Sequence, residues 1–272
     1  FSFEYDSDLW EFGLSHIDIQ ENFNARMGYV RRTNIKTTQS NVEYNPRPTR
    51  WKSIRQFSYR LRHQYMTDHD NNMLEAQLTA SFSIRYQNSA RIYTGVERKY
   101  EFLDKDWEVR PNFWIPMDTY ETWRGYVWFF SNESSDITGN FYASYGTYYT
   151  GKSLRLNPDF SIYNFQRIRM DVDVSYNRVD LPVGDFTAKT FGFRFYYYFS
   201  TNLYLKTYFQ WNDDRKANDG NQISIGNILL HWIYKPGSNF YLVFNDGRLI
   251  GPSWQEITNR TLLLKATFFW RK

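Results

Sequence analysis

The chain contains no cysteine among its 272 residues, and it has no long uncharged apolar run. Without cysteine it forms neither a disulfide framework nor a thiolate metal site. No apolar run approaches the ~18 residues that a membrane-spanning helix needs. The charge is also nearly balanced, because 33 basic residues face 29 acidic ones. The resulting formal charge of +4 is too small to indicate a nucleic-acid partner.

Aromatic residues, by contrast, are abundant. The chain has 23 Tyr, 23 Phe and 10 Trp, which together make up 21% of its residues, yet its mean hydropathy is only −0.68. Disordered chains are poor in aromatic residues, so this composition argues against disorder. A Leu-rich helical core is not expected from a composition that is polar on average.

The dominant pattern along the chain is an alternation with a period of two. Between Leu74 and Tyr86, every second residue is Leu, Ala, Phe, Ile or Tyr, whereas the residues between them are Glu, Gln, Thr, Ser and Arg. The same alternation recurs over 167–176, 190–199 and 203–212. This period predicts β-strands with one apolar and one polar face.

The lengths of these strands favour a transmembrane barrel over a soluble sandwich. The repeat is roughly eighteen residues per strand and turn, whereas sandwich strands recur every ~8–12 residues and a membrane strand needs ~9–11. The polar face is rich in Arg, Gln, Ser, Thr, Tyr and Asp, which suits a wet, partly filled lumen. The sequence therefore predicts an all-β protein, an antiparallel outer-membrane β-barrel with an outward apolar band and aromatic girdles. A soluble β-sandwich is the alternative fold.

About fifteen strands are expected. They are predicted at 1–5, 9–19, 33–45, 52–66, 73–87, 89–103, 119–132, 137–150, 152–157, 164–179, 187–200, 202–212, 222–235, 239–246 and 260–271. Tight turns are predicted at 87–89, 200–202 and 235–238, and longer links at 104–118, 212–221 and 246–258. Tight turns normally face the periplasm and long loops face outward.

The strand number also predicts an incomplete barrel. Single-chain bacterial barrels have even strand numbers. Fifteen strands with a periplasmic C-terminus would place Phe1 outside. We therefore expect 1–272 to be one β-barrel domain, the C-terminal portion of a longer chain whose complete barrel has 16 or more strands.

Several segments resemble one known family. They are 21–24 (ENFN), 28–33 (GYVRRT), 176–182 (YNRVDLP), 184–186 (GDF), 231–238 (HWIYKPGS), 243–248 (VFNDGR) and 259–262 (NRTL). Together they are similar to the C-terminal barrel region of a family of Gram-negative outer-membrane proteins of unknown function. Ala25, His231 and Lys235 depart from the usual Pro, Asn and Arg of that pattern.

Longer members of this family carry an N-terminal domain similar to family-9 carbohydrate-binding modules. The resemblance therefore implies that such a domain and the first strands lie upstream of the chain. It implies no catalytic residue, because the family has no established activity.

The predicted lumen wall is the first candidate site. Its polar and charged residues are Arg60, Arg62, Glu75, Arg85, Arg167, Arg169, Asp171, Asp173, Arg194 and Lys206. One interpretation is a charged channel wall that selects solutes. The other is a network of ion pairs that fills and stiffens the lumen, since inward charges need partners where water is scarce.

Tryptophans in the predicted loops are a second candidate. Trp107, Trp114 and Trp254 lie near acidic residues and arginines, where they could contact ligands by stacking on sugars. Alternatively they pack the loops onto the barrel mouth or sit in the interfacial belt.

Asp68 and His69 suggest an alternative function. On an outer loop, a histidine beside a carboxylate could activate water in a surface hydrolase with a rim active site. The other interpretation is a polar turn between two long strands. Because the histidines show no metal-ligand spacing and no nucleotide fingerprint appears, we expect no metal and no cofactor.

The sequence thus predicts a non-enzymatic protein of the bacterial outer membrane. It would act as a channel, or as a scaffold subunit of a complex that handles carbohydrate or exports protein. Its expected partners are outer-membrane lipid, lipopolysaccharide, other outer-membrane or periplasmic proteins and glycans, but not nucleic acid.

Overall fold

The computed structural model describes residues 1–30, 32–165, 167–215 and 217–270. Within them every regular element is a β-strand, and no helix there is long and apolar enough to cross a membrane. The strands are β1 (Ser2–Asp6), β2 (Trp10–Ile19), β3 (Ile35–Tyr44), β4 (Ile54–Thr67), β5 (Met73–Tyr86), β6 (Arg91–Phe102), β7 (Trp107–Arg110), β8 (Phe113–Ile115), β9 (Thr119–Phe130), β10 (Ile137–Tyr148), β11 (Gly151–Phe165), β12 (Ile168–Leu181), β13 (Gly184–Ser200), β14 (Leu203–Asn212), β15 (Gln222–Lys235), β16 (Ser238–Ile250) and β17 (Gln255–Thr267).

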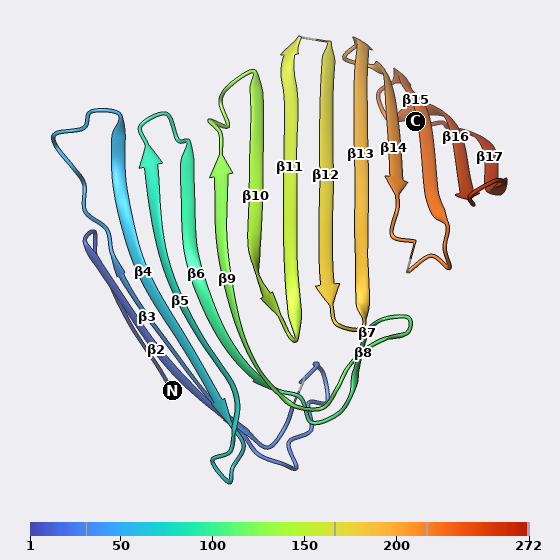
Figure 1. Ribbon diagram of the computed structural model, residues 1–272. Coiled ribbons are helices and arrows are strands. Elements are labelled where there is room, and N and C mark those ends of the chain that lie inside the picture. Colours follow the sequence, from blue (N-terminus) through green and yellow to red (C-terminus); the bar gives the residue numbers. More distant parts are fainter. Residues whose placement is uncertain (31, 166, 216, 271–272) are drawn as a thin grey trace. The chain divides into compact units, whose positions relative to one another are not determined.

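Fifteen of these strands form one antiparallel sheet in which sequence neighbours are also spatial neighbours (Figure 1). The strand number and the all-β class predicted from the alternation are confirmed. Among the described residues, β1 and β17 each pair with one neighbour only, so the sheet is not closed into a barrel. Barrel closure therefore stays a prediction.

The chain divides into two compact units. Unit 1 comprises Phe1–Phe130, Ala143–Leu154 and Val179–Asp185, and unit 2 comprises Ser131–Tyr142, Arg155–Arg178 and Phe186–Lys272. Each unit holds several long neighbouring strands, so each presents two faces of sheet.

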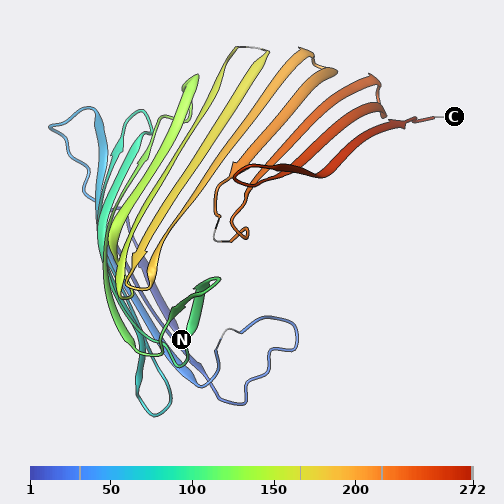
Figure 2. The same ribbon diagram turned by 45° about the vertical axis from the view of Figure 1, so that its right-hand side comes forward.

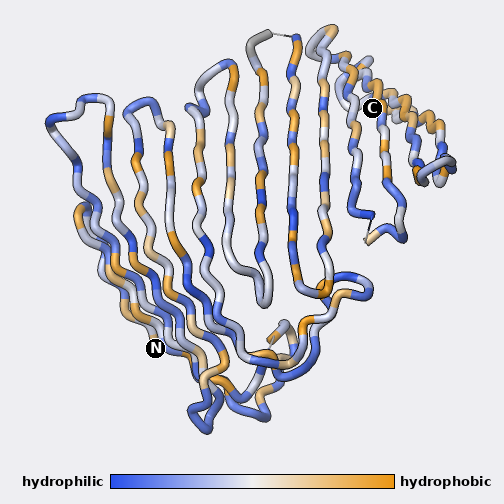
Figure 3. Tube along the Cα trace, in the orientation of Figure 1, coloured by the Kyte–Doolittle hydropathy of each residue, from blue (hydrophilic) through white to orange (hydrophobic). Residues whose placement is uncertain are grey.

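The two faces differ in chemistry, as the register shows. In unit 1, Arg60 pairs with Ser81 on one face, which we call the polar face, and Tyr59 pairs with Phe82 on the other, the apolar face. In unit 2, Arg194 opposite Tyr208 marks the polar face and Phe193 opposite Phe209 the apolar face. Figure 3 shows the same alternation of hydrophilic and hydrophobic residues along many strands.

Among the described residues, neither unit buries a large hydrophobic core. The buried apolar residues of unit 1 include Phe113 and Ile115, both on β8. The β7–β8 hairpin interrupts the link between β6 and β9 and stands apart from the sheet strands (Figure 2). Trp107 on β7 packs edge-on against Tyr149, with ring centroids 5.5 Å apart, and Phe113 lies beside Gly184. The predicted long link over 104–118 is therefore a folded hairpin.

The bounds of several predicted strands were wrong. The ninth strand, predicted at 152–157, is β11 and extends to Phe165. Its polar Asn157, Pro158 and Asp159 resemble a loop in sequence. In the structure Asp159 accepts a hydrogen bond from Asn140 of β10 at 2.9 Å, and Asn157 accepts one from Ser175 of β12 at 3.3 Å.

The predicted long link over 246–258 was also wrong. Strand β16 continues to Ile250 and β17 begins at Gln255, so only 251–254 connect them. The last strand, predicted at 260–271, ends at Thr267. Residues 166 and 271, which fell within predicted strands, lie outside the described residues.

The two longest connections, 20–34 and 103–118, emerge at one end of the strands. That end also carries two-residue links at 149–150 and 182–183, and the other end carries a nine-residue link at 45–53. Since antiparallel neighbours alternate in direction, the turns after β5, β13 and β15 emerge at one end, which we call the short-turn end. The links after β2, β6 and β14, at residues 20–34, 103–118 and 213–221, emerge at the other, the long-loop end. The predicted tight turns at 87–89, 200–202 and 235–238 are confirmed.

Candidate functional site: the polar face of the sheet

In unit 1 the polar face is lined by ion pairs that join neighbouring strands. Arg60 of β4 stands opposite Glu43 of β3 in the register and forms an ion pair with it. The Glu43 side chain is only 7% exposed. An almost buried carboxylate requires such a partner, because leaving its charge uncompensated costs several kcal/mol.

A second cluster on this face joins β5, β6 and β9. Glu97 accepts hydrogen bonds from Arg124 and from Gln77, both at 2.7 Å. Next to it, Lys99 binds Glu101 at 2.9 Å, and Glu101 also accepts a hydrogen bond from the Tyr149 hydroxyl at 3.2 Å. These groups line a cavity of about 260 Å³.

In unit 2 the polar face carries a similar arrangement on β11–β13. Asp171 accepts hydrogen bonds from Ser161 at 2.6 Å and from Arg169 at 3.1–3.3 Å. Arg194 contacts Asp173 more loosely, at 3.5 Å. A cavity of about 520 Å³ borders these residues.

In unit 2, cationic side chains of the polar face form cation–π contacts with tyrosine rings. The Arg169 guanidinium lies 4.8 Å from the ring centroid of Tyr163, and Arg194 lies 5.1 Å from that of Tyr208. The Lys206 ammonium lies 5.4 Å from the ring of Tyr196. A cation over an aromatic face gains about 0.5–1 kcal/mol at an exposed site. The alternation placed Tyr196 and Tyr208 among the polar-face positions, but it did not indicate that they would bind cations.

The predicted lumen residues therefore fall into two groups. Arg60, Glu75, Arg169, Asp171, Asp173 and Arg194 take part in ion pairs. Within the described residues, no ion pair forms at Arg62, Arg85, Arg167 or Lys206. Arg167 lies in the turn before β12 rather than on a strand. The ion pairs support the interpretation as a stiffening network. The cations without an ion pair support the interpretation as a charged channel wall.

His231 forms a buried polar cluster that sequence analysis did not find. Its Nδ1 atom lies 2.7 Å from the Tyr204 hydroxyl and its Nε2 atom 2.9 Å from Asn239 Oδ1. Its ring stacks on Tyr241 at 4.3 Å, and the residue is 8% exposed. The partners lie on β14 and β16, the two strands that flank β15, so only the register could have revealed them.

The three candidate loop tryptophans have different surroundings. Trp107 packs against Tyr149, which agrees with the packing interpretation for that residue. Trp114, on β8, is 50% exposed. Trp254 folds back over Gly251, whose amide donates a hydrogen bond to the Trp254 carbonyl at 3.0 Å.

His69 is bonded to residues other than its neighbour Asp68. Its Nε2 atom lies 2.8 Å from Asp18 Oδ1 and its Nδ1 atom 2.6 Å from Asn34 Oδ1. A general base needs one free ring nitrogen to accept a proton. Because both are engaged, this arrangement does not favour the rim hydrolase.

Asp68 instead caps its own loop. Its carboxylate accepts hydrogen bonds from the side-chain amide and the backbone amide of Asn72, both at 2.8 Å. The bond from the Asn72 side chain is the main reason that the pKa of Asp68 is lowered. Hydrogen bonds to a charged carboxylate favour that form. The geometry thus matches the polar-turn interpretation.

Comparisons with protein-family models, with curated proteins and with solved structures find no match for this chain. The resemblance to the outer-membrane family therefore stays a prediction from the seven motifs.

Proposed function

We propose that the chain is part of a non-enzymatic β-barrel of the bacterial outer membrane that forms a channel or a scaffold subunit of an outer-membrane complex. The observation that carries this proposal is the exposed apolar face of the long strands. In unit 1 it presents Tyr59, Leu61, Leu78, Val96 and Trp123, whose exposed fractions range from 43% to 50%. Water-soluble proteins rarely expose contiguous apolar patches beyond a few hundred Å², whereas lipid would cover such a face.

The strands are long enough for this role. Strand β5 has 14 residues. Such a strand extends roughly 46 Å, or roughly 35 Å along the axis of a barrel at a tilt of about 40°, which exceeds the ~25 Å apolar band of outer-membrane barrels.

Ion pairs on the apolar face support a boundary near the long-loop end. Arg98 pairs with Glu121 on this face of unit 1, four residues before β6 ends at Phe102. In unit 2, Asp246 pairs with Arg248 and Arg260, again four residues before β16 ends at Ile250. Charges are tolerated at the lipid interface but are costly at the bilayer midplane. The headgroups of lipid and lipopolysaccharide would therefore meet this end.

Aromatic side chains support a second boundary near the short-turn end. In unit 1, Trp10 at the start of β2 and Tyr44 at the end of β3 form a ring pair with centroids 4.6 Å apart. In unit 2, Trp232 and Tyr234 lie at the corresponding end of β15. Tyr and Trp concentrate at membrane–water interfaces.

The polar faces would then line the lumen. Their ion pairs hold neighbouring strands together, and the unpaired cations at Arg62, Arg85 and Lys206 favour passage or binding of anionic solutes. Glycans and other envelope proteins are the further partners that we propose, on the strength of the family resemblance.

Detergent extraction and reconstitution test this proposal. We expect the folded chain, with any upstream segment of its natural protein, to need detergent for solubility and to migrate differently on gels before and after boiling. A channel would give stepwise conductance in planar bilayers, whereas a silent barrel would favour the scaffold. A chain that is monomeric and folded in buffer without detergent would overturn the membrane assignment.

A further inference from the structure

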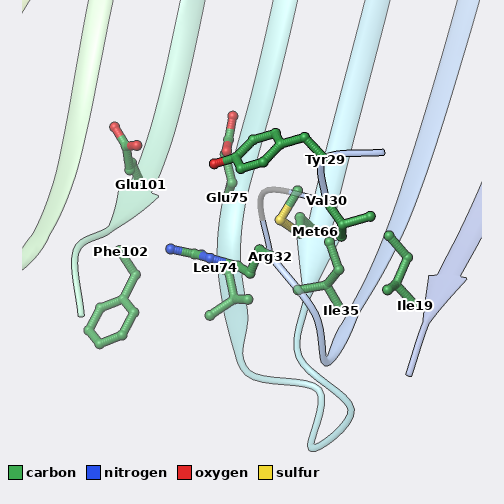
Figure 4. A pocket seen from close by; sticks show the side chains of 10 residues that line it. All are labelled: Ile19, Tyr29, Val30, Arg32, Ile35, Met66, Leu74, Glu75, Glu101 and Phe102. Carbon is green, nitrogen blue, oxygen red and sulfur yellow. The ribbon is translucent and has the colours of Figure 1, made fainter. Parts of the chain in front are cut away.

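A cavity of about 280 Å³ lies in unit 1 at the long-loop end. The link over 20–34 supplies Tyr29, Val30 and Arg32 to its wall, and the strand ends supply the rest (Figure 4). Apolar side chains form much of the lining: Ile19, Val30, Ile35, Met66, Leu74 and Phe102. Ile35 is itself 6% exposed, so this part of the wall is shielded from solvent and apolar.

Two carboxylates also line the cavity, and they are unequally compensated. Lys99 binds Glu101 at 2.9 Å but lies 4.0 Å from Glu75. Glu101 accepts a further hydrogen bond from Tyr149. The Glu75 side chain is only 16% exposed and has Lys99 as its single ion-pair partner within the described residues. A carboxylate that is mostly buried and weakly paired favours the approach of another cation.

Arg32 is the complementary group on the loop side. It is half-buried and lines the cavity, yet it makes no hydrogen bond or ion pair with any described residue. A guanidinium carries five N–H donors in a planar fork that fits a carboxylate. The cavity therefore combines an unpartnered cation, an under-compensated anion and an apolar wall.

We propose that this cavity binds a small zwitterion with an apolar body, of the class of hydrophobic α-amino acids. The ligand carboxylate pairs with Arg32, its ammonium pairs with Glu75, and its apolar side chain lies against Ile19, Ile35 and Met66. A ligand of about ten heavy atoms fits a space of this volume, given that a water molecule occupies about 30 Å³. The site depends only on unit 1, so it stands whether or not the sheet closes or spans a membrane.

Three ligands with the same apolar body test the proposal. L-Leucine carries both charges, 4-methylpentanoate only the carboxylate, and isopentylamine only the ammonium. The binding of each to the folded chain is followed by saturation-transfer NMR titration. Each charged hydrogen-bonded contact contributes about tenfold or more to affinity. We therefore expect L-leucine to bind at least tenfold more tightly than either single-charge ligand.

Two variants test whether the ligand carboxylate pairs with Arg32 and the ligand ammonium with Glu75. In Arg32→Gln, L-leucine should lose its advantage over isopentylamine but keep its advantage over 4-methylpentanoate. In Glu75→Gln, L-leucine should lose its advantage over 4-methylpentanoate but keep its advantage over isopentylamine. Arg26→Gln and Glu21→Gln change exposed residues of the same loop that do not line the cavity, and they should leave all affinities unchanged. Circular dichroism confirms that each variant is folded.

Three outcomes would overturn the proposal. They are the absence of binding to the folded wild-type chain, equal binding of the three ligands, and equal losses in the cavity variants and the loop controls. The lipid-facing assignment does not depend on any of them, because it rests on the apolar face rather than on this cavity.

Discussion

Arg98 donates two hydrogen bonds, at 2.8 and 2.9 Å, to the two carboxylate oxygens of Glu121 on the face that is otherwise apolar. The guanidinium also lies 5.5 Å from the ring centroid of Trp123, and the Trp123 indole donates to Glu121 at 3.3 Å. An ion pair beside a tryptophan is typical of a membrane interface. In the membrane setting that we propose, this pair would divide the apolar face of unit 1 into a band for hydrocarbon and a rim for headgroups.

The position of this rim can be tested with arginine. Val96 and Tyr100 share the apolar face of β6, two residues to either side of Arg98. Val96→Arg should reduce the free energy of unfolding in lipid vesicles by more than Tyr100→Arg, for which a loss of about 0–1 kcal/mol is expected near the interface. Urea titration of the reconstituted protein measures both, and equal losses would contradict the rim.

The free energy of unfolding should depend on Glu97, at the centre of the polar-face network of unit 1. Its side chain is 15% exposed and accepts bonds from Arg124 and Gln77. Glu97→Ala leaves both donors without this acceptor, so we expect the free energy of unfolding to fall by about 1–2 kcal/mol. The matched control is Glu4→Ala, at an exposed position of β1, which should change it by less than about 0.5 kcal/mol. Equal effects would show that the network contributes nothing to stability.

Gly146 should not tolerate a side chain. A Cβ atom there would overlap the Trp123 carbonyl oxygen and lie 2.6 Å from the Arg124 Cα atom, and this backbone is fixed in β9. Gly146→Ala should therefore cost about 1–3 kcal/mol of unfolding free energy or prevent folding. Gly125→Ala is the control, because its nearest neighbour is 4.0 Å away. A stable Gly146→Ala variant would contradict this packing.

The stability of the loop that Asp68 caps should depend on pH in the acidic range. Its pKa lies below the ordinary value of 3.8, mainly because of the hydrogen bond from the Asn72 side chain. The bond therefore stabilises the loop fully above that ordinary value, and this stabilisation is lost as the pH falls through the lowered pKa. Hydrogen exchange of the Asn72 amide should accelerate, relative to its intrinsic rate, only in that acidic range. Asp68→Asn should abolish the acid dependence and Asp104→Asn should not.

Sequence alone predicted the strands well because a period of two survives in almost every one of them. It failed where polar residues lie inside a strand. Asn157 and Asp159 bond to neighbouring strands, and Asp246 pairs with Arg248 and Arg260 on the apolar face. Such residues resemble loop composition until their partners are known.

The candidate site was less predictable than the fold. The alternation placed Arg60 and Arg169 on the polar face, but their partners depend on register. His69 shows this most clearly, since it binds Asp18, 51 residues earlier, rather than the adjacent Asp68. The seven-motif resemblance and barrel closure remain predictions.

The central claim is that the apolar face contacts lipid and the polar face contacts water. Because the chain has no cysteine, single cysteines can be labelled with nitroxide at Ala80, which pairs with Val96 on the apolar face, and at Ser81, its neighbour on the polar face of β5. After reconstitution, electron paramagnetic resonance measures the accessibility of each label to oxygen and to a water-soluble nickel complex. We predict that the Ala80 label favours oxygen and the Ser81 label favours nickel. Equal accessibility of both labels to the nickel complex would contradict the account.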